Sequence, residues 1–66
     1  MKAPEQMTHT ERLKTARAWA REKGGVLRRQ CSTINGAPAY GVQDPAGEWL
    51  CENWTLYSIA CEVVYA

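Results

Sequence analysis

Three cysteines and one histidine are the side chains of this sequence best suited to metal binding or nucleophilic catalysis: Cys31, Cys51, Cys61 and His9. A structural zinc site needs four good ligands, and its cysteines usually come in closely spaced pairs. No two cysteines of this chain form a C-x-x-C pair, and His9 lies far before all three. An odd number of cysteines also cannot close a complete disulfide framework. We therefore expect three reduced thiols, no metal site and no cofactor.

Acid–base chemistry has equally little support in the sequence. Asp44 lies in an expected turn, and Glu48 and Glu52 lie on or beside an expected strand, with no histidine near them in sequence. A general base must be positioned close to the group that it deprotonates, and a catalytic cysteine needs such a base too. We therefore expect that the protein is not an enzyme.

The charges are divided unevenly along the 66 residues. All eight Lys and Arg residues lie within residues 1–29 together with three Glu, so this stretch carries +5. The remaining 37 residues hold four acidic residues and no basic one, so they carry −4. Either half could be a functional surface, because each has a charge of one sign.

The basic half contains a candidate patch for nucleic-acid phosphates or for an acidic protein partner. On a helix, Lys14, Arg17 and Arg21 share one face. Arg28 and Arg29 point to opposite faces of a strand, so at most one of them extends the patch. The alternative interpretation is an ordinary solvated helix face. The acidic half could equally face a basic, nucleic-acid-binding protein.

The elements that position these residues begin with a helix over residues 8–23. Thr8-His9-Thr10-Glu11 fits a capping box, and Gly24-Gly25 supplies the stop. Four apolar residues recur at helical spacing between them: Leu13, Ala16, Trp19 and Ala20. Residues 1–7 are interpreted as a flexible N-terminal tail, and residues 8–66 as a single small domain.

Three short strands follow the helix. VLRRQCSTI and APAYGVQ flank Asn35-Gly36, which suits a two-residue hairpin turn. Asp44-Pro45-Ala46-Gly47 is a second turn, and EWLCE is the third strand. Pro38 lacks an N–H group, so we expect its end of the strand to lie at an edge or a bulge. The pattern predicts a three-stranded antiparallel meander.

Residues 54–65 fit two patterns. Alternate residues are apolar, as in a strand, but Leu56, Ile59, Ala60 and Val63 also repeat as in a helix. We favour a helix, because Asn53 or Thr55 can cap it and because the sheet needs a second cover. The expected fold is then α+β, in the order α-β-β-β-α, with two helices packed on one face of the sheet.

A helix in this segment would be apolar around most of its circumference. Its polar residues occupy a sector of about 60°, whereas a surface helix usually needs one apolar stripe of 100° or somewhat more. The surplus falls on four residues that we expect to form a protein interface: Trp54, Tyr57, Cys61 and Tyr65. Exposed apolar patches, and Trp and Tyr in particular, are typical of binding surfaces.

These features together favour a small, non-catalytic protein-binding module. By analogy of size alone, it resembles accessory proteins of bacteria, phages or mobile elements, and one concrete form is an inhibitor or adaptor of a larger nucleic-acid-handling protein. The alternatives are a weak nucleic-acid-binding protein that uses the basic patch, and a purely self-associating homodimer. Without a signal peptide or an apolar run long enough to span a membrane, we expect a cytoplasmic protein with no membrane contact.

Overall fold

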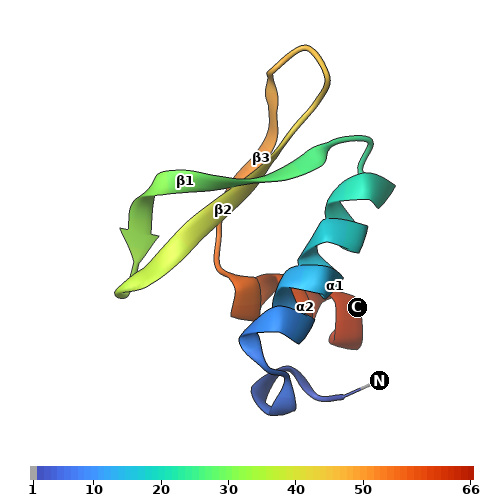
Figure 1. Ribbon diagram of the computed structural model, residues 1–66, viewed down its shortest axis with the longest axis vertical. Helices are drawn as coiled ribbons and strands as arrows, with labels where there is room; N and C mark the ends of the chain where they lie inside the picture. The colour runs from blue at the N-terminus through green and yellow to red at the C-terminus, as the bar shows by residue number, and fades with distance from the viewer. Residues whose placement is uncertain (1) are drawn as a thin grey trace.

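Two helices flank three consecutive strands in the computed structural model, which describes residues 2–66 (Figure 1). The elements are a short 3-10 helix η1 (Pro4–Gln6), α1 (His9–Glu22), β1 (Val26–Ile34), β2 (Ala37–Gln43), β3 (Trp49–Trp54) and α2 (Leu56–Tyr65). The chain therefore has the expected α+β fold, in the expected order α-β-β-β-α.

The segment before α1 is packed on the domain. Its single-turn helix η1 lies against α2, and Pro4 and Met7 are buried. The Arg12 guanidinium holds this turn, because its Nε and Nη2 donate to the Pro4 carbonyl oxygen at 3.1 and 2.8 Å. Residues 4–7 thus belong to the packed domain, whereas the sequence analysis assigned them to the tail over residues 1–7. Their apolar side chains are too few to form a recognisable sequence pattern.

The expected capping box starts α1. Thr8 Oγ1 accepts a hydrogen bond from the Glu11 N–H at 3.2 Å, and Glu11 Oε1 accepts one from the Thr8 N–H at 3.0 Å. Gly24 ends the helix with a φ of 85°, a value that glycine adopts without steric strain. The helix expected over residues 8–23 is therefore confirmed.

The three strands form an antiparallel sheet in the order β1-β2-β3. Asn35 and Gly36 both have positive φ, as the expected hairpin turn requires, and the Gly47 N–H donates to the Asp44 carbonyl in the second turn. Pro38 pairs with β1, whereas β3 pairs with β2 at Tyr40 and beyond. Pro38 therefore lies at a local edge of the sheet, where its missing N–H costs little.

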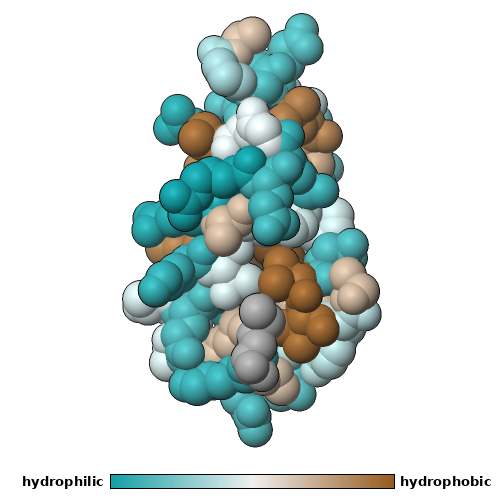
Figure 2. All heavy atoms as spheres, turned by 90° about the vertical axis from the view of Figure 1, so that its right-hand side faces the viewer, coloured by the Kyte–Doolittle hydropathy of each residue, from teal (hydrophilic) through white to brown (hydrophobic). Residues whose placement is uncertain are grey.

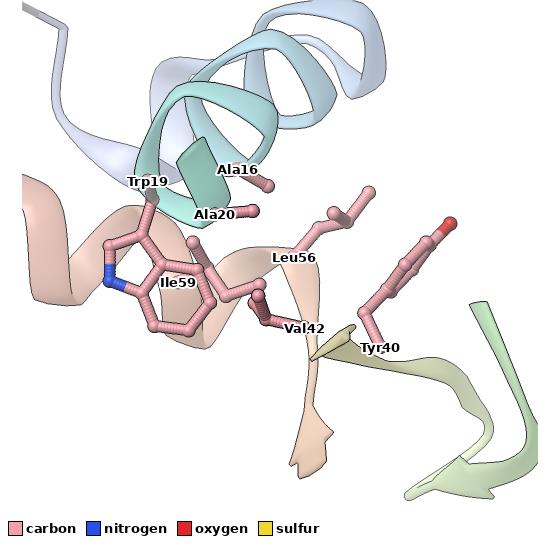
Figure 3. Close-up of a cluster of buried hydrophobic side chains, with 7 residues drawn as sticks. All are labelled: Ala16, Trp19, Ala20, Tyr40, Val42, Leu56 and Ile59. Atoms are coloured by element: carbon pink, nitrogen blue, oxygen red, sulfur yellow. The ribbon is translucent and has the colours of Figure 1, made fainter. Parts of the chain in front are cut away.

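The segment that fitted two patterns is helical from Leu56, and Thr55 is its N-cap, since its Oγ1 accepts from the Ser58 N–H at 3.0 Å. Both helices cover the same face of the sheet (Figure 1). Between them and β2 lies the core, in which side chains from the three elements point toward one another (Figure 3). Its members are Ala16, Trp19, Ala20, Tyr40, Val42, Leu56 and Ile59.

Among the helices of residues 2–66, none has the length and apolar character needed to cross a membrane.

Candidate binding surfaces

Three of the four residues expected at an interface lie in a row along the outer side of α2. Tyr57, Cys61 and Tyr65 are spaced four residues apart, so they follow one another on one side of the helix. Tyr57 is 45% exposed and Tyr65 is 64% exposed, while Cys61 is half-buried. Together with Ser58 and Glu62 they line a hollow of about 370 Å³. We refer to Tyr57, Cys61 and Tyr65 as the α2 patch.

The fourth residue, Trp54, does not join the α2 patch. It is the last residue of β3, it is half-buried, and it packs against the core cluster. The centroid of its ring lies 5.1 Å from that of Trp19, with a tilt of 57° between the planes, which is a favourable aromatic contact. Trp54 would share an arc with Tyr57 only if the helix began at or before residue 54. In the structure a strand ends at Trp54 and Thr55 separates it from α2.

Tyr57 is held from two sides. The guanidinium carbon of Arg12 lies 5.3 Å from the centre of the Tyr57 ring, within the range of a cation–π interaction. A side-chain hydrogen bond with Cys61, followed by the charge interactions with Cys61 and Glu5, raises the pKa of Tyr57 above its ordinary value.

A second hollow, of about 430 Å³, opens on the other side of Tyr57. It lies between the start of α1, the tip of the β1–β2 hairpin and the start of α2, and its lining includes Arg12, Ile34, Pro38 and Tyr40. The hairpin tip was not among the residues predicted to form a binding surface. The available signal was a pair of apolar residues, Ile34 and Ala37, directly beside the Asn35-Gly36 turn.

Figure 2 shows a different side of the molecule from the hairpin tip. The figure faces the side on which α1 and the C-terminus lie, and it shows apolar side chains gathered beside α1, next to the hydrophilic side chains of α1 itself.

The fold keeps Lys14, Arg17 and Arg21 on one exposed face of α1, and it places Arg28 and Arg29 on opposite faces of the sheet. Arg17 and Arg21 line a groove with Val26 and Leu27 at the start of β1, whereas Lys14 lines a different hollow that includes Val63 of α2. Arg28 and Arg29 pair across the sheet with Gly41 and Tyr40, on opposite faces. Within residues 2–66, none of these five cations takes part in a salt bridge or a side-chain hydrogen bond. Their charges are therefore available to a partner.

The cysteines lie on three different elements, β1, β3 and α2, and all three are free. In the part of the chain that the structure describes, no three His, Cys, Asp or Glu side chains are grouped closely enough to hold a metal ion.

Comparison of the chain with protein-family models, with curated proteins and with solved structures found no match.

Proposed function

We propose that this protein is a small protein-binding module without catalytic activity, and that its partner contacts the α2 patch. The observation that carries the proposal is the exposure of Tyr57 and Tyr65 on a helix whose inner side already covers the sheet. Ile59 and Ala60 are fully buried, and Leu56 is nearly buried. These three side chains pack α2 against the core, and the two tyrosines are not needed for that packing.

The α2 patch has the composition of a binding hot spot. Tyrosine combines a large apolar ring with a hydroxyl group, and it loses little conformational entropy when it is buried. The cation–π contact with Arg12 restricts the Tyr57 ring before any partner arrives. The hollows on both sides of Tyr57 offer places for apolar side chains of a partner.

The concrete form of the proposal is an inhibitor or adaptor that acts on a larger nucleic-acid-handling protein. Proteins of that kind have basic surfaces, and the second half of this chain is acidic and free of Lys and Arg. Asp44 and Glu48 lie at the β2–β3 turn and Glu52 lies on β3, at the end of the sheet order opposite to β1. These carboxylates would attract a basic partner at long range, and Glu62, which lines the hollow beside the α2 patch, would attract it where the patch supplies apolar contact.

The test is capture of a partner from an extract of the native cytoplasm that has been treated with nuclease. Tagged wild-type protein is compared with a Tyr57→Glu, Tyr65→Glu double variant. Because the two tyrosines are exposed, we expect the double variant to remain folded and to lose the captured protein.

A matched control is an Ala18→Glu, Leu50→Glu double variant. It adds the same two charges at exposed apolar positions of α1 and β3, outside the α2 patch. We expect it to retain the partner. Equal capture by all three proteins would contradict the proposal, and sedimentation of the purified protein would show whether a second copy of the chain is the occupant.

A further inference from the structure

The face of the sheet opposite the helices has an exposed aromatic ring. Tyr40 and Val42 point into the core from β2, so Gly41 between them faces the other way. A β-carbon built on Gly41 would lie 2.7 Å from Cζ3 and 2.8 Å from Cε3 of Trp49. The Trp49 ring therefore lies directly over Gly41, where any larger residue would displace it. It remains 39% exposed.

An arginine lies beside this ring. Arg28 is the cross-strand partner of Gly41, so its side chain emerges on the helix-free face next to Trp49. The two residues are 21 positions apart in the sequence, and only the register of the three strands brings them together. In the sequence, five of the six aromatic residues follow the last basic residue, whereas the folded sheet places Trp49 on the same face as Arg28.

The basic surface continues from Arg28 to the first helix. Val26 lines two neighbouring hollows, one shared with Arg28 and Gln43 and the other shared with Arg17 and Arg21 of α1. Three unpaired guanidinium groups thus lie on a connected track that starts at α1, passes the beginning of β1 and leads to Trp49. Asp44 also lines the first of these hollows. Its carboxylate is held within the β2–β3 turn, because its Oδ1 accepts a hydrogen bond from the Glu48 N–H at 2.9 Å.

We infer that this track, formed by Arg17, Arg21, Arg28 and Trp49, binds single-stranded nucleic acid. The arginines contact successive phosphates and the Trp49 ring stacks on an unpaired base. Positive grooves combined with an exposed aromatic ring are the usual means of holding single strands without sequence preference. The inference is independent of the α2 patch, which lies on the helical side of the molecule (Figure 1).

The ring decides between the possible anionic partners. An acidic peptide would use the three arginines but would gain little from a tryptophan beside them. A nucleic-acid duplex keeps its bases stacked inside, so its phosphates could reach the arginines while Trp49 stayed unused. A single strand can place its phosphates on the arginines and one unpaired base on the Trp49 ring at the same time.

The experiment measures fluorescence anisotropy of a labelled 12-nucleotide oligothymidine with the purified full chain. We expect binding at low salt, with a log–log slope of affinity against salt of about −2 for three phosphate contacts to a single strand. Trp49→Ala should weaken binding about 5- to 150-fold, since loss of one stacked base costs about 1–3 kcal/mol. Trp49→Tyr should keep most of the affinity, because a tyrosine ring can still stack.

Two controls separate the track from general charge and from loss of structure. Arg29→Ala removes one exposed charge from the opposite face of β1 and should leave the affinity within about twofold of wild type. Arg17→Ala with Arg28→Ala removes two phosphate contacts and should reduce the magnitude of the salt slope by about 1.4. Circular dichroism confirms that each variant is folded.

No binding by the wild type at low salt would overturn the inference. So would unchanged affinity in a folded Trp49→Ala variant, or tighter binding of the duplex or of a labelled hexaglutamate peptide than of the single strand.

Discussion

The two helices pack side by side on the same face of the sheet, but the side chains on their outer sides differ in polarity. α1 has an acidic residue in its first turn and a basic one in its last, and its exposed positions include Lys14, Arg17 and Arg21. α2 has neither, and its outer side exposes Tyr57 and Tyr65. The charged side chains on the outer side of α1 are well solvated in the free protein. The exposed rings on the outer side of α2 are not, which is why a protein partner is proposed there.

The helices also differ in how they reach the core. α1 contributes the small residues Ala16 and Ala20 with a single large one, Trp19, whereas α2 contributes Leu56 and Ile59. Two alanines with no exposed surface allow α1 to approach closely, and the branched side chains of α2 fill the space between the helices and the sheet. The comparison leads to four predictions.

The largest effect is expected on the inner side of α2. Ile59 is fully buried, so Ile59→Ala should lower the free energy of unfolding by about 2–5 kcal/mol. Tyr65→Ala, on the outer side of the same helix, should change it by no more than about 0.5 kcal/mol. Urea denaturation measures both. If Tyr65→Ala were the more destabilising of the two, α2 would be packed the other way round and the α2 patch would be core.

The next effect concerns the close approach of α1. Ala20 has no exposed surface, and a longer side chain there would have to displace the core, so Ala20→Leu should cost about 1–3 kcal/mol. Ala18→Leu, at an exposed position of the same helix, is the matched control and should be nearly neutral. Thermal unfolding compares the stabilities of the two variants. Equal stability would mean that α1 does not pack closely against the core at Ala20.

A smaller effect is expected at the helix starts. Thr8→Ala removes the hydroxyl that accepts from the Glu11 N–H, and Thr55→Ala removes the one that accepts from the Ser58 N–H. Each should cost about 1 kcal/mol. Because serine has a hydroxyl that can accept the same hydrogen bond, Thr8→Ser should keep the stability of α1. A Thr8→Ala variant as stable as wild type would show that the capping box contributes nothing.

The smallest effect is a dependence on pH that belongs to α1. Hydrogen bonding from the Thr8 N–H, and then from Lys2, lowers the pKa of Glu11 below its ordinary value of 4.5. A lowered folded-state pKa means that the stabilisation is present above the unfolded-state pKa and is lost as the pH falls through the folded-state pKa. The stability difference between wild type and Glu11→Gln should therefore shrink when denaturation is measured from pH 7 down to pH 3. A difference that stays constant over this range would contradict the assignment.

Local signals explain why the order of the elements could be predicted from the sequence. The capping box at Thr8, the Asn35-Gly36 turn and the Asp44–Gly47 turn each fix a boundary through contacts within a few residues, and the structure has each of them. Thr55 decided the ambiguous C-terminal segment in the same way, since a cap favours a helix.

The surfaces could be predicted only in part. Helical spacing relates Tyr57, Cys61 and Tyr65 directly, so these three could be predicted. Trp54 was wrongly grouped with them, because β3 ends at Trp54 and the helix begins only at Leu56. The proximity of Arg28 and Trp49 could not be predicted, since it depends on the register of three strands and on a glycine between them. Contacts between side chains of different strands depend on how all three strands are aligned in the sheet.

The central claim, that the outer side of α2 is a binding surface, is tested most directly by the reactivity of Cys61. This thiol lies in the α2 patch, and the exposed Cys31 on β1 serves as an internal reference. Alkylation of both thiols is followed by mass spectrometry in dilute purified protein, in concentrated purified protein and in nuclease-treated native extract. We predict that Cys61 is alkylated several-fold more slowly in the extract than in the dilute protein, while the alkylation rate of Cys31 does not change. If the alkylation of Cys61 is also slower in the concentrated protein, a second copy of the chain covers the α2 patch. Equal rates for Cys61 under all three conditions would contradict the claim.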